Sequence, residues 1–174
     1  MPLTYLVDGY NVLHREPRFR GLLRHDLETA RDALAEHVAA FCMASHDSVK
    51  LVFDGQGRQP ETLTAPGADP RFEIIYSPGK HTADTVIERL VYTAPKRSNV
   101  VVVTSDNGLR GLCRGLGAFS MAPESFLTTV REARNRAASF QEQRQHKGSL
   151  SELEDRLDPS ALRALRNLRK RLDE

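Results

Sequence analysis

The chain has 174 residues, 40% of them hydrophobic, and its 25 lysines and arginines against 23 aspartates and glutamates leave a formal net charge of +2. A chain of this length is typical of one main domain whose core needs no disulfide or zinc support, and the two cysteines fall in no metal-binding pattern. Neither a membrane-length apolar run nor a signal-peptide pattern occurs, so we expect a cytoplasmic protein with no membrane partner.

The first half of the chain contains two predicted strands, a helix and a long loop. Residues 3–7 form a β-prone run that stops at the turn dipeptide Asp8-Gly9. An arginine-rich segment follows, which we expect to be a loop. Apolar side chains then recur every three or four residues over 23–41, which predicts a helix. A second strand is predicted at 49–53, and the Gly-, Pro- and Gln-rich stretch 55–70 is predicted to be a mobile loop.

The second half continues the alternation of strands and helices. Strands are predicted at 72–76, 100–104 and, more briefly, 117–121. Thr82 is a suitable N-cap for a helix to residue 92, and Ser105 or Asp106 for a helix to residue 115. Pro123 opens a helix that the polar run QEQRQHKG is expected to end, and Asp158-Pro159 starts a final helix.

This alternation predicts an α/β fold, with a mostly parallel central sheet between two layers of helices. We expect this three-layer domain to occupy residues 1–147. Residues 148–174 are expected to form a C-terminal helical extension.

Acidic residues follow three of the predicted strands. Asp8 and Asp54 come directly after the first two, and Asp106 comes two residues after the strand at 100–104. Because ligands bind where the carboxyl ends of parallel strands meet, these acids should share one rim. Asp84 falls in the first turn of the helix at 82–92, and Glu88 would project beside it one turn later. Each acid alone also has a structural explanation, as a turn residue, a helix cap or a partner of the helix dipole.

Grouped carboxylates repel one another unless a cation lies among them, and Mg²⁺ and Mn²⁺ prefer such hard oxygen ligands. An ion of this kind can activate water and neutralise a scissile phosphate, which predicts hydrolysis of phosphodiesters. The candidate metal ligands from this pattern are Asp8, Asp54, Asp84, Asp106 and Glu88. No P-loop, HExxH or GxSxG motif occurs, and GxGxxG is missing from the first strand–helix turn, so no nucleotide cofactor is expected.

A polyanion that approaches an acidic site needs basic residues around it to position its phosphates. The candidates lie in rim loops or first turns and are Arg15, Arg18, Arg20, Lys80, His81, Arg110 and Arg114. Tyr10 and Phe19 could stack on unpaired bases, although such residues are more often part of a core. The basic segments 15–24 and 131–147 could equally be ordinary solvated surfaces.

Four sequence blocks resemble the YacP-like branch of the NYN domain family in their order and spacing: VDGYNVLH at 7–14, VFDG at 52–55, HTADTVIERL at 81–90 and VVTSDNGLR at 102–110. The similarity extends over residues 3–137. It implies a PIN-like fold and a divalent-metal-dependent ribonuclease, with bacterial members acting on ribosome-associated RNA. It assigns the family's acids to Asp8, Asp84 and Asp106, and the asparagine that orders the site to Asn11. Leu109 and Arg110 depart from the polar Glu-Gln pair that members often carry.

The leading hypothesis is therefore an endoribonuclease that uses Mg²⁺ or Mn²⁺ to hydrolyse RNA, with RNA and the ribosome as its expected partners. Two alternatives remain open. A non-catalytic RNA- or ribosome-binding module would need the basic residues but not the acids. A metal-dependent nuclease acting on DNA is the other, because recognition of the 2′-hydroxyl leaves no motif in this sequence.

Overall fold

The computed structural model describes residues 1–55, 62–63, 69–79 and 81–154, and it divides the chain into two compact units, Met1–Arg134 and Asn135–Glu174. Most of the predicted loop at 55–70, Lys80 and the predicted helix after Asp158 lie outside the described residues. The expected division at residues 147 and 148 stays a prediction.

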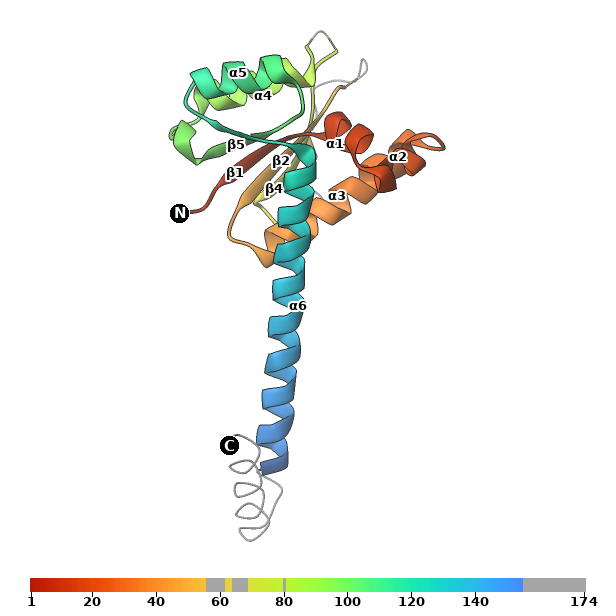
Figure 1. Ribbon diagram of the computed structural model, residues 1–174, viewed down its shortest axis with the longest axis vertical. Coiled ribbons are helices and arrows are strands. Elements are labelled where there is room, and N and C mark those ends of the chain that lie inside the picture. Colours follow the sequence, from red (N-terminus) through yellow and green to blue (C-terminus); the bar gives the residue numbers. More distant parts are fainter. Residues whose placement is uncertain (56–61, 64–68, 80, 155–174) are drawn as a thin grey trace. The chain divides into compact units, whose positions relative to one another are not determined.

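In the described part of the chain, the first unit is built on a sheet with the strand order β3-β4-β2-β1-β5-β6, of which β4, β2, β1 and β5 are labelled in Figure 1. Five strands run parallel, and the two-residue β3 pairs antiparallel with β4. The strands are β1 (Thr4–Asp8), β2 (Ser48–Phe53), β3 (Thr62–Leu63), β4 (Phe72–Tyr76), β5 (Val100–Val103) and β6 (Phe119–Met121). The predicted parallel α/β sheet is confirmed.

Helices cover both faces of this sheet (Figure 1). The helices are α1 (Gly9–Arg15), α2 (Pro17–Leu23), α3 (Leu27–Ala44), α4 (Ala83–Thr93), α5 (Asn107–Gly115) and α6 (Pro123–Glu154), with a 3₁₀ turn at Arg97–Asn99. Side chains alternate along each strand, so Val7 packs with α1, α3 and the first turns of α6, whereas Leu6 packs with α4 and α5. The result is the predicted three-layer arrangement.

The arginine-rich segment after β1 is helical, so the expectation of a loop was wrong. Asp8 caps α1, and Pro17 is the first residue of α2. Proline suits this position because a backbone N–H there would have no hydrogen-bond partner within the helix. Phe19 of α2 is only 1% exposed, packed within the core that includes α3. The burial of Phe19 stabilises α2. This helix has only seven residues, which is too few for an apolar repeat to be recognised in the sequence.

Helix α6 continues through the polar run at 141–148 to Glu154, so its predicted end was also wrong. Gln, Glu, Arg and Lys are good helix formers, and polarity alone does not stop a helix. Phe126 and Val130, in the turns that belong to the first unit, are fully buried in its core. The second unit begins at Asn135, one turn further along.

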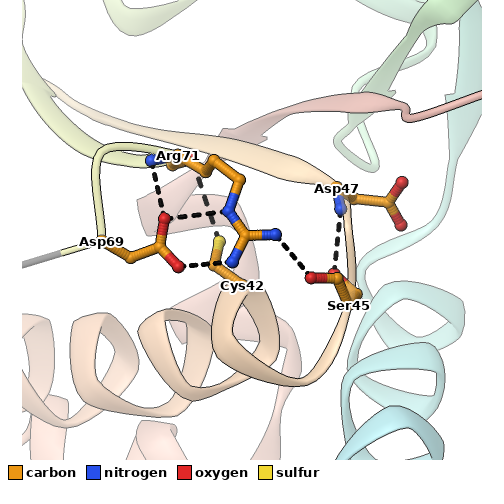
Figure 2. A network of polar contacts seen from close by, with 5 residues as sticks. All are labelled: Cys42, Ser45, Asp47, Asp69 and Arg71. Carbon is orange, nitrogen blue, oxygen red and sulfur yellow. Dashed lines mark hydrogen bonds and ion pairs between the residues drawn. The ribbon is translucent and has the colours of Figure 1, made fainter.

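Polar contacts of Arg71 link two segments at the amino edge of the sheet (Figure 2). Arg71 donates from Nε to Asp69 Oδ1 over 2.9 Å and from Nη1 to the carbonyl of Ser45 over 2.6 Å. The thiol of Cys42 lies 3.8 Å from the carbonyl oxygen of Arg71. These contacts join the end of α3 to the start of β4, at the edge opposite the strand ends that carry the predicted acids.

Among the helices that the structure describes, none has a stretch apolar and long enough to cross a bilayer.

Candidate active site

The carboxyl ends of β1, β2 and β5 and the starts of α1, α4 and α5 surround a cleft of about 410 Å³. Four carboxylates line it, each from a different strand end or helix start. The lining residues are Asp8, Tyr10, Asn11, His14, Arg15, Asp54, Asp84, Ser105 and Asp106. The structure therefore brings together the four predicted aspartates, and also Asn11 and Arg15. Glu88 lies one turn further along α4 and does not line the cleft.

Three of these aspartates each orient the start of a helix with one carboxylate oxygen. Asp8 Oδ1 accepts from the Asn11 amide over 3.0 Å, and Asp106 Oδ1 accepts from the Leu109 amide over 2.7 Å. Asp54 Oδ1 accepts from the amide of Ala83, the first residue of α4, over 2.6 Å. The bond to Oδ1 fixes the position of each carboxylate. The second oxygen, Oδ2, takes no part in these three backbone hydrogen bonds. The structural and the functional explanations of these acids are therefore compatible.

Asp8 is the most buried of the four, at 8% exposed. Its pKa is raised to about 6, chiefly by burial, and the charges of Asp84 and Asp54 contribute to this rise. The hydrogen bond from the Asn11 amide and a long one of 3.5 Å from Thr104 Oγ1 oppose this rise. Loss of solvation thus outweighs the hydrogen bonds at this carboxyl group.

Asp84 is exposed, yet its environment also disfavours its charged form. Partial burial of the carboxyl group raises its pKa, and the charges of Asp106 and Asp54 add to the rise. In the part of the chain that the structure describes, the ion pairs are Lys50 with Glu73 and Arg71 with Asp69, so no basic side chain neutralises these four carboxylates at ion-pair distance.

Asn11 joins the two sides of the cleft. Its side-chain oxygen accepts from the Ser105 amide over 2.9 Å and from Ser105 Oγ over 2.6 Å. Arg15 Nε also donates to Ser105 Oγ, over 3.2 Å. The segment after β1 is thereby fastened to the segment after β5, which carries Asp106. This geometry agrees with the ordering role that the family resemblance implies for Asn11.

A buried cation beneath the cleft was not predicted. Arg31 of α3 is 8% exposed, and its Cζ lies 5.2 Å from the ring centroid of Tyr10 and 5.6 Å from those of Phe53 and Tyr76. Its Nη2 contacts the Tyr10 hydroxyl. Tyr10 is therefore held with its ring at the cleft, whereas the buried Phe19 cannot stack on a base. An arginine in a helical repeat carries no sequence signal for such burial.

The other predicted basic residues have varied surroundings. Arg20 donates to the carbonyls of His14 and Arg15 over 3.1 and 3.3 Å, which holds the junction of α1 and α2. Arg114 Nε donates to Ser120 Oγ over 2.7 Å. Arg110 Nε is buried without a hydrogen-bond partner among the described residues.

Two further members of the predicted basic set lie away from the cleft lining. His81 is exposed just before α4, and Arg18 lines a separate pocket. His14, which sequence reasoning did not single out, does line the cleft.

The donor chemistry of the cleft fits a hard divalent cation. Its carboxylates form no ion pair with the basic side chains that the structure describes, and they raise one another's pKa, an effect that a bound divalent ion would reverse. No three His, Cys, Asp or Glu side chains in the described part are arranged to hold an ion by themselves. Mg²⁺ commonly binds through one or two carboxylates and completes its coordination with waters and substrate phosphates.

Comparison with known proteins agrees with this architecture. The model of the YacP-like NYN domain family matches residues 5–170. The chain belongs to this family. The predicted family is therefore confirmed. The NYN domain is a nuclease-type domain, and the general functional class of this chain follows from that.

Two kinds of relative support this assignment. YacP of Bacillus subtilis (strain 168), described as an uncharacterized protein, is 29% identical over 126 residues, which are 72% of this chain and 73% of the relative. A crystal structure of a mutant of Rae1 (YacP) from Bacillus subtilis is 28% identical, with a TM-score of 0.64 over 76% of this chain and 77% of that one. A second Rae1 (YacP) structure, at 24% identity, shares the fold with a TM-score of 0.67 over 98% and 95% of the two chains.

Proposed function

We propose that this NYN-family protein is a divalent-metal-dependent endoribonuclease that hydrolyses RNA phosphodiester bonds. The observation that carries this proposal is the cleft lined by four aspartates that no basic side chain of the described residues neutralises at ion-pair distance. Because clustered carboxylates disfavour ionisation, a folded protein that keeps four of them in one cleft has a use for a cation there. The nuclease-type family makes a phosphodiester the natural substrate class.

The proposal places Mg²⁺ or Mn²⁺ among Asp8, Asp84 and Asp106, with Asp54 in the same cleft, and one or two of these carboxylates would contact the ion directly. When bound, such an ion neutralises the scissile phosphate and supplies a reactive water at neutral pH. The chain's own residues do the positioning: helix caps orient three carboxylates, and Asn11 joins the two sides of the site. Arg15 and His14 line the same cleft, where they can attract and position the strand.

Cleavage assays test this proposal directly. Purified protein is incubated with single-stranded RNA, single-stranded DNA or mRNA-loaded ribosomes, each with Mn²⁺, Mg²⁺ or EDTA. We expect RNA cleavage with either metal and none in EDTA. Asp84→Asn should abolish cleavage and preserve RNA binding, because it removes one negative charge from an exposed position without removing a helix cap. Asp32→Asn, the same change at an exposed site on α3, is the matched control and should remain active.

Other outcomes of the same assay decide between the alternatives. Equal RNA binding by the wild type and Asp84→Asn, with no cleavage of RNA or ribosome-bound mRNA, would favour a binding module. Preferential cleavage of single-stranded DNA would favour a DNA nuclease. Faster cleavage on ribosomes than of free mRNA would support the ribosome as a partner, which the family resemblance implies.

A further inference from the structure

A second, smaller pocket of about 120 Å³ lies among α2, α3 and the first turns of α6. Arg18, His37 and Arg131 line it, together with Glu16, Glu124 and the ring of Phe19. All of these residues belong to the first compact unit. The function proposed above does not use this pocket.

Aromatic contacts hold the pocket's side chains in place. The Phe19 ring is almost completely buried, and the His37 ring stands edge-on to it with centroids 6.0 Å apart and planes inclined by 71°. Arg18 Cζ lies 5.8 Å from the Phe19 centroid, within the range of a cation–π contact. The pocket therefore has a rigid apolar base beneath its charged groups.

Two arginines, Arg18 and Arg131, and two glutamates, Glu16 and Glu124, line the pocket, and a third arginine, Arg134, contacts His37 from outside its lining. Arg134 Nη1 donates to His37 Nδ1 over 2.8 Å, so three arginines surround one imidazole. Burial lowers the pKa of His37, and the charges of Arg134, Arg18 and Arg131 lower it further. Glu16 and Glu124 line the same pocket, but neither is at ion-pair distance from these arginines, since the described ion pairs lie elsewhere. Among the described residues, Arg131 Nη2 donates to Thr128 Oγ1 over 3.3 Å, and the other guanidinium nitrogens of Arg18 and Arg131 have no hydrogen-bond partner, so they remain available to an anion.

The pocket is close to the candidate active site along the chain. Arg15 lines the cleft, and Arg18, three residues later, lines the pocket. Three residues span at most about 11 Å, so the two Cα atoms cannot be further apart than that. The two sites are therefore adjacent in the fold, within reach of one RNA strand.

We propose that this pocket is a second binding site for the RNA strand, in which Arg18 and Arg131 hold a backbone phosphate away from the scissile one. This inference rests on the proposed ribonuclease function for the identity of its ligand. Guanidinium groups suit phosphate because their planar set of donors can form paired hydrogen bonds to it. The site contacts the backbone and not the bases, so it adds affinity and fixes the strand's position without reading its sequence.

The imidazole of His37 is a reporter inside this site. An anion among the arginines offsets their repulsion of the imidazolium, so phosphate binding should raise the pKa of His37. The test is an NMR pH titration of His37 in the full-length protein in EDTA, with the signal assigned by His37→Gln. Inorganic phosphate is the first probe, a short single-stranded RNA is the second, and an uncharged nucleic-acid analogue of the same base sequence is the control. We expect both anionic probes to raise the pKa of His37 and the uncharged analogue to leave it unchanged.

Variants connect this signal to RNA binding. Arg131→Gln should weaken RNA binding roughly tenfold and reduce the salt dependence of log K by about 0.7, the loss of one phosphate contact. It should raise KM for cleavage and leave kcat at saturating RNA near the wild-type value. Arg18→Gln provides an independent variant with the same expected pattern. Arg89→Gln, an exposed arginine of α4, is the matched control and should bind RNA normally.

The outcomes separate this inference from the proposed function. An RNA-induced rise in the pKa of His37 without any cleavage would uphold the phosphate site and reject the ribonuclease. Cleavage by the wild type with no effect of RNA on His37 would reject the phosphate site alone. A response to inorganic phosphate but not to RNA would mean adventitious anion binding only. Unchanged RNA affinity and salt dependence in both arginine variants would also overturn the inference.

Discussion

Asp8 combines a structural and an electrostatic role in one side chain. It caps α1, yet its carboxyl group is buried beside two other acids, with a pKa raised from 3.8 to about 6. A shift of this size corresponds to about 3 kcal/mol against the ionised form. Ionised Asp8 therefore destabilises the metal-free protein at neutral pH, although a divalent cation would bind this ionised form.

Asp8→Asn tests this electrostatic cost. Because the pKa is higher in the folded than in the unfolded state, the folded protein binds more protons between pH 3.8 and about 6. Wild-type stability should thus fall as pH rises through that window. Asparagine retains the cap without the charge, so we expect the variant to gain up to about 3 kcal/mol relative to wild type between pH 4 and pH 7. Urea unfolding in EDTA measures this difference, and a variant less stable at every pH would mean that the carboxylate is mainly structural.

Tyr10 offers a second test at a single position. Tyr10→Phe keeps the ring at the cleft but leaves the buried Arg31 without its contact to the hydroxyl. We expect a stability loss of about 1–3 kcal/mol with RNA affinity nearly unchanged. Tyr10→Ala removes the ring as well and should weaken RNA binding by about 1–3 kcal/mol if a base stacks there. Unfolding curves and RNA titrations separate the two effects, and equal RNA affinity of both variants would exclude stacking.

At the scale of elements, the site is an assembly of helix starts joined across the sheet. Helices α1, α4 and α5 each begin at an aspartate-bound amide, and the Asn11–Ser105 contact joins the segments after β1 and β5. The neutral amide side chain of Asn11 therefore links the segments that carry Asp8 and Asp106.

Asn11→Ala should show this dependence. The variant leaves the Ser105 amide and hydroxyl without their acceptor, and we expect a stability loss of about 1–3 kcal/mol. Cleavage should slow through kcat more than through KM, because the carboxylates lose their relative position while the basic residues remain. Ser105→Ala keeps the backbone bond and should have the milder effect. A normal kcat in a destabilised Asn11→Ala protein would show that the link serves folding only.

The polar contacts of Arg71 lie at the edge of the sheet opposite the cleft, so they allow a comparison with the site (Figure 2). Arg71→Ala removes the contacts to Asp69 and Ser45 at the amino edge of the sheet. We expect a lower melting temperature and an unchanged kcat, because the cleft lies at the carboxyl edge. Thermal unfolding and a cleavage assay below the melting temperature measure both quantities. A selective loss of kcat would show that the two edges are coupled.

For the whole molecule, a cation and the folded state should stabilise each other. Mn²⁺ or Mg²⁺ that binds only the folded protein should raise its melting temperature. The rise should be larger at pH 7.5 than at pH 5, because Asp8, with a pKa of about 6, must ionise to bind a metal, and the raised pKa of Asp84 acts in the same direction. Asp84→Asn should reduce the rise, and Asp32→Asn should not. No metal-induced change, even with a non-hydrolysable RNA present, would contradict the metal site.

Local sequence patterns determined much of the fold. The strand at Phe72–Tyr76 has its predicted bounds, and Thr82 and Asp106 cap α4 and α5 as expected. Strand β5 was predicted one residue too long. Strands and helix caps can be predicted from the sequence because apolar runs and capping residues depend on residues that are neighbours along the chain. The parallel topology then implies that acids at several strand ends meet, which the cleft of Asp8, Asp54, Asp84 and Asp106 bears out in its geometry.

Tertiary structure decided what local patterns could not. Helix α2 exists because Phe19 is buried in the core, and Arg31 is buried because three aromatic rings from different elements surround it. The pocket around His37 joins α3 to arginines of α6 that lie about ninety positions later in the chain. Contacts of this kind depend on how elements pack in space, and the side chains involved have no periodic spacing that a single sequence could display.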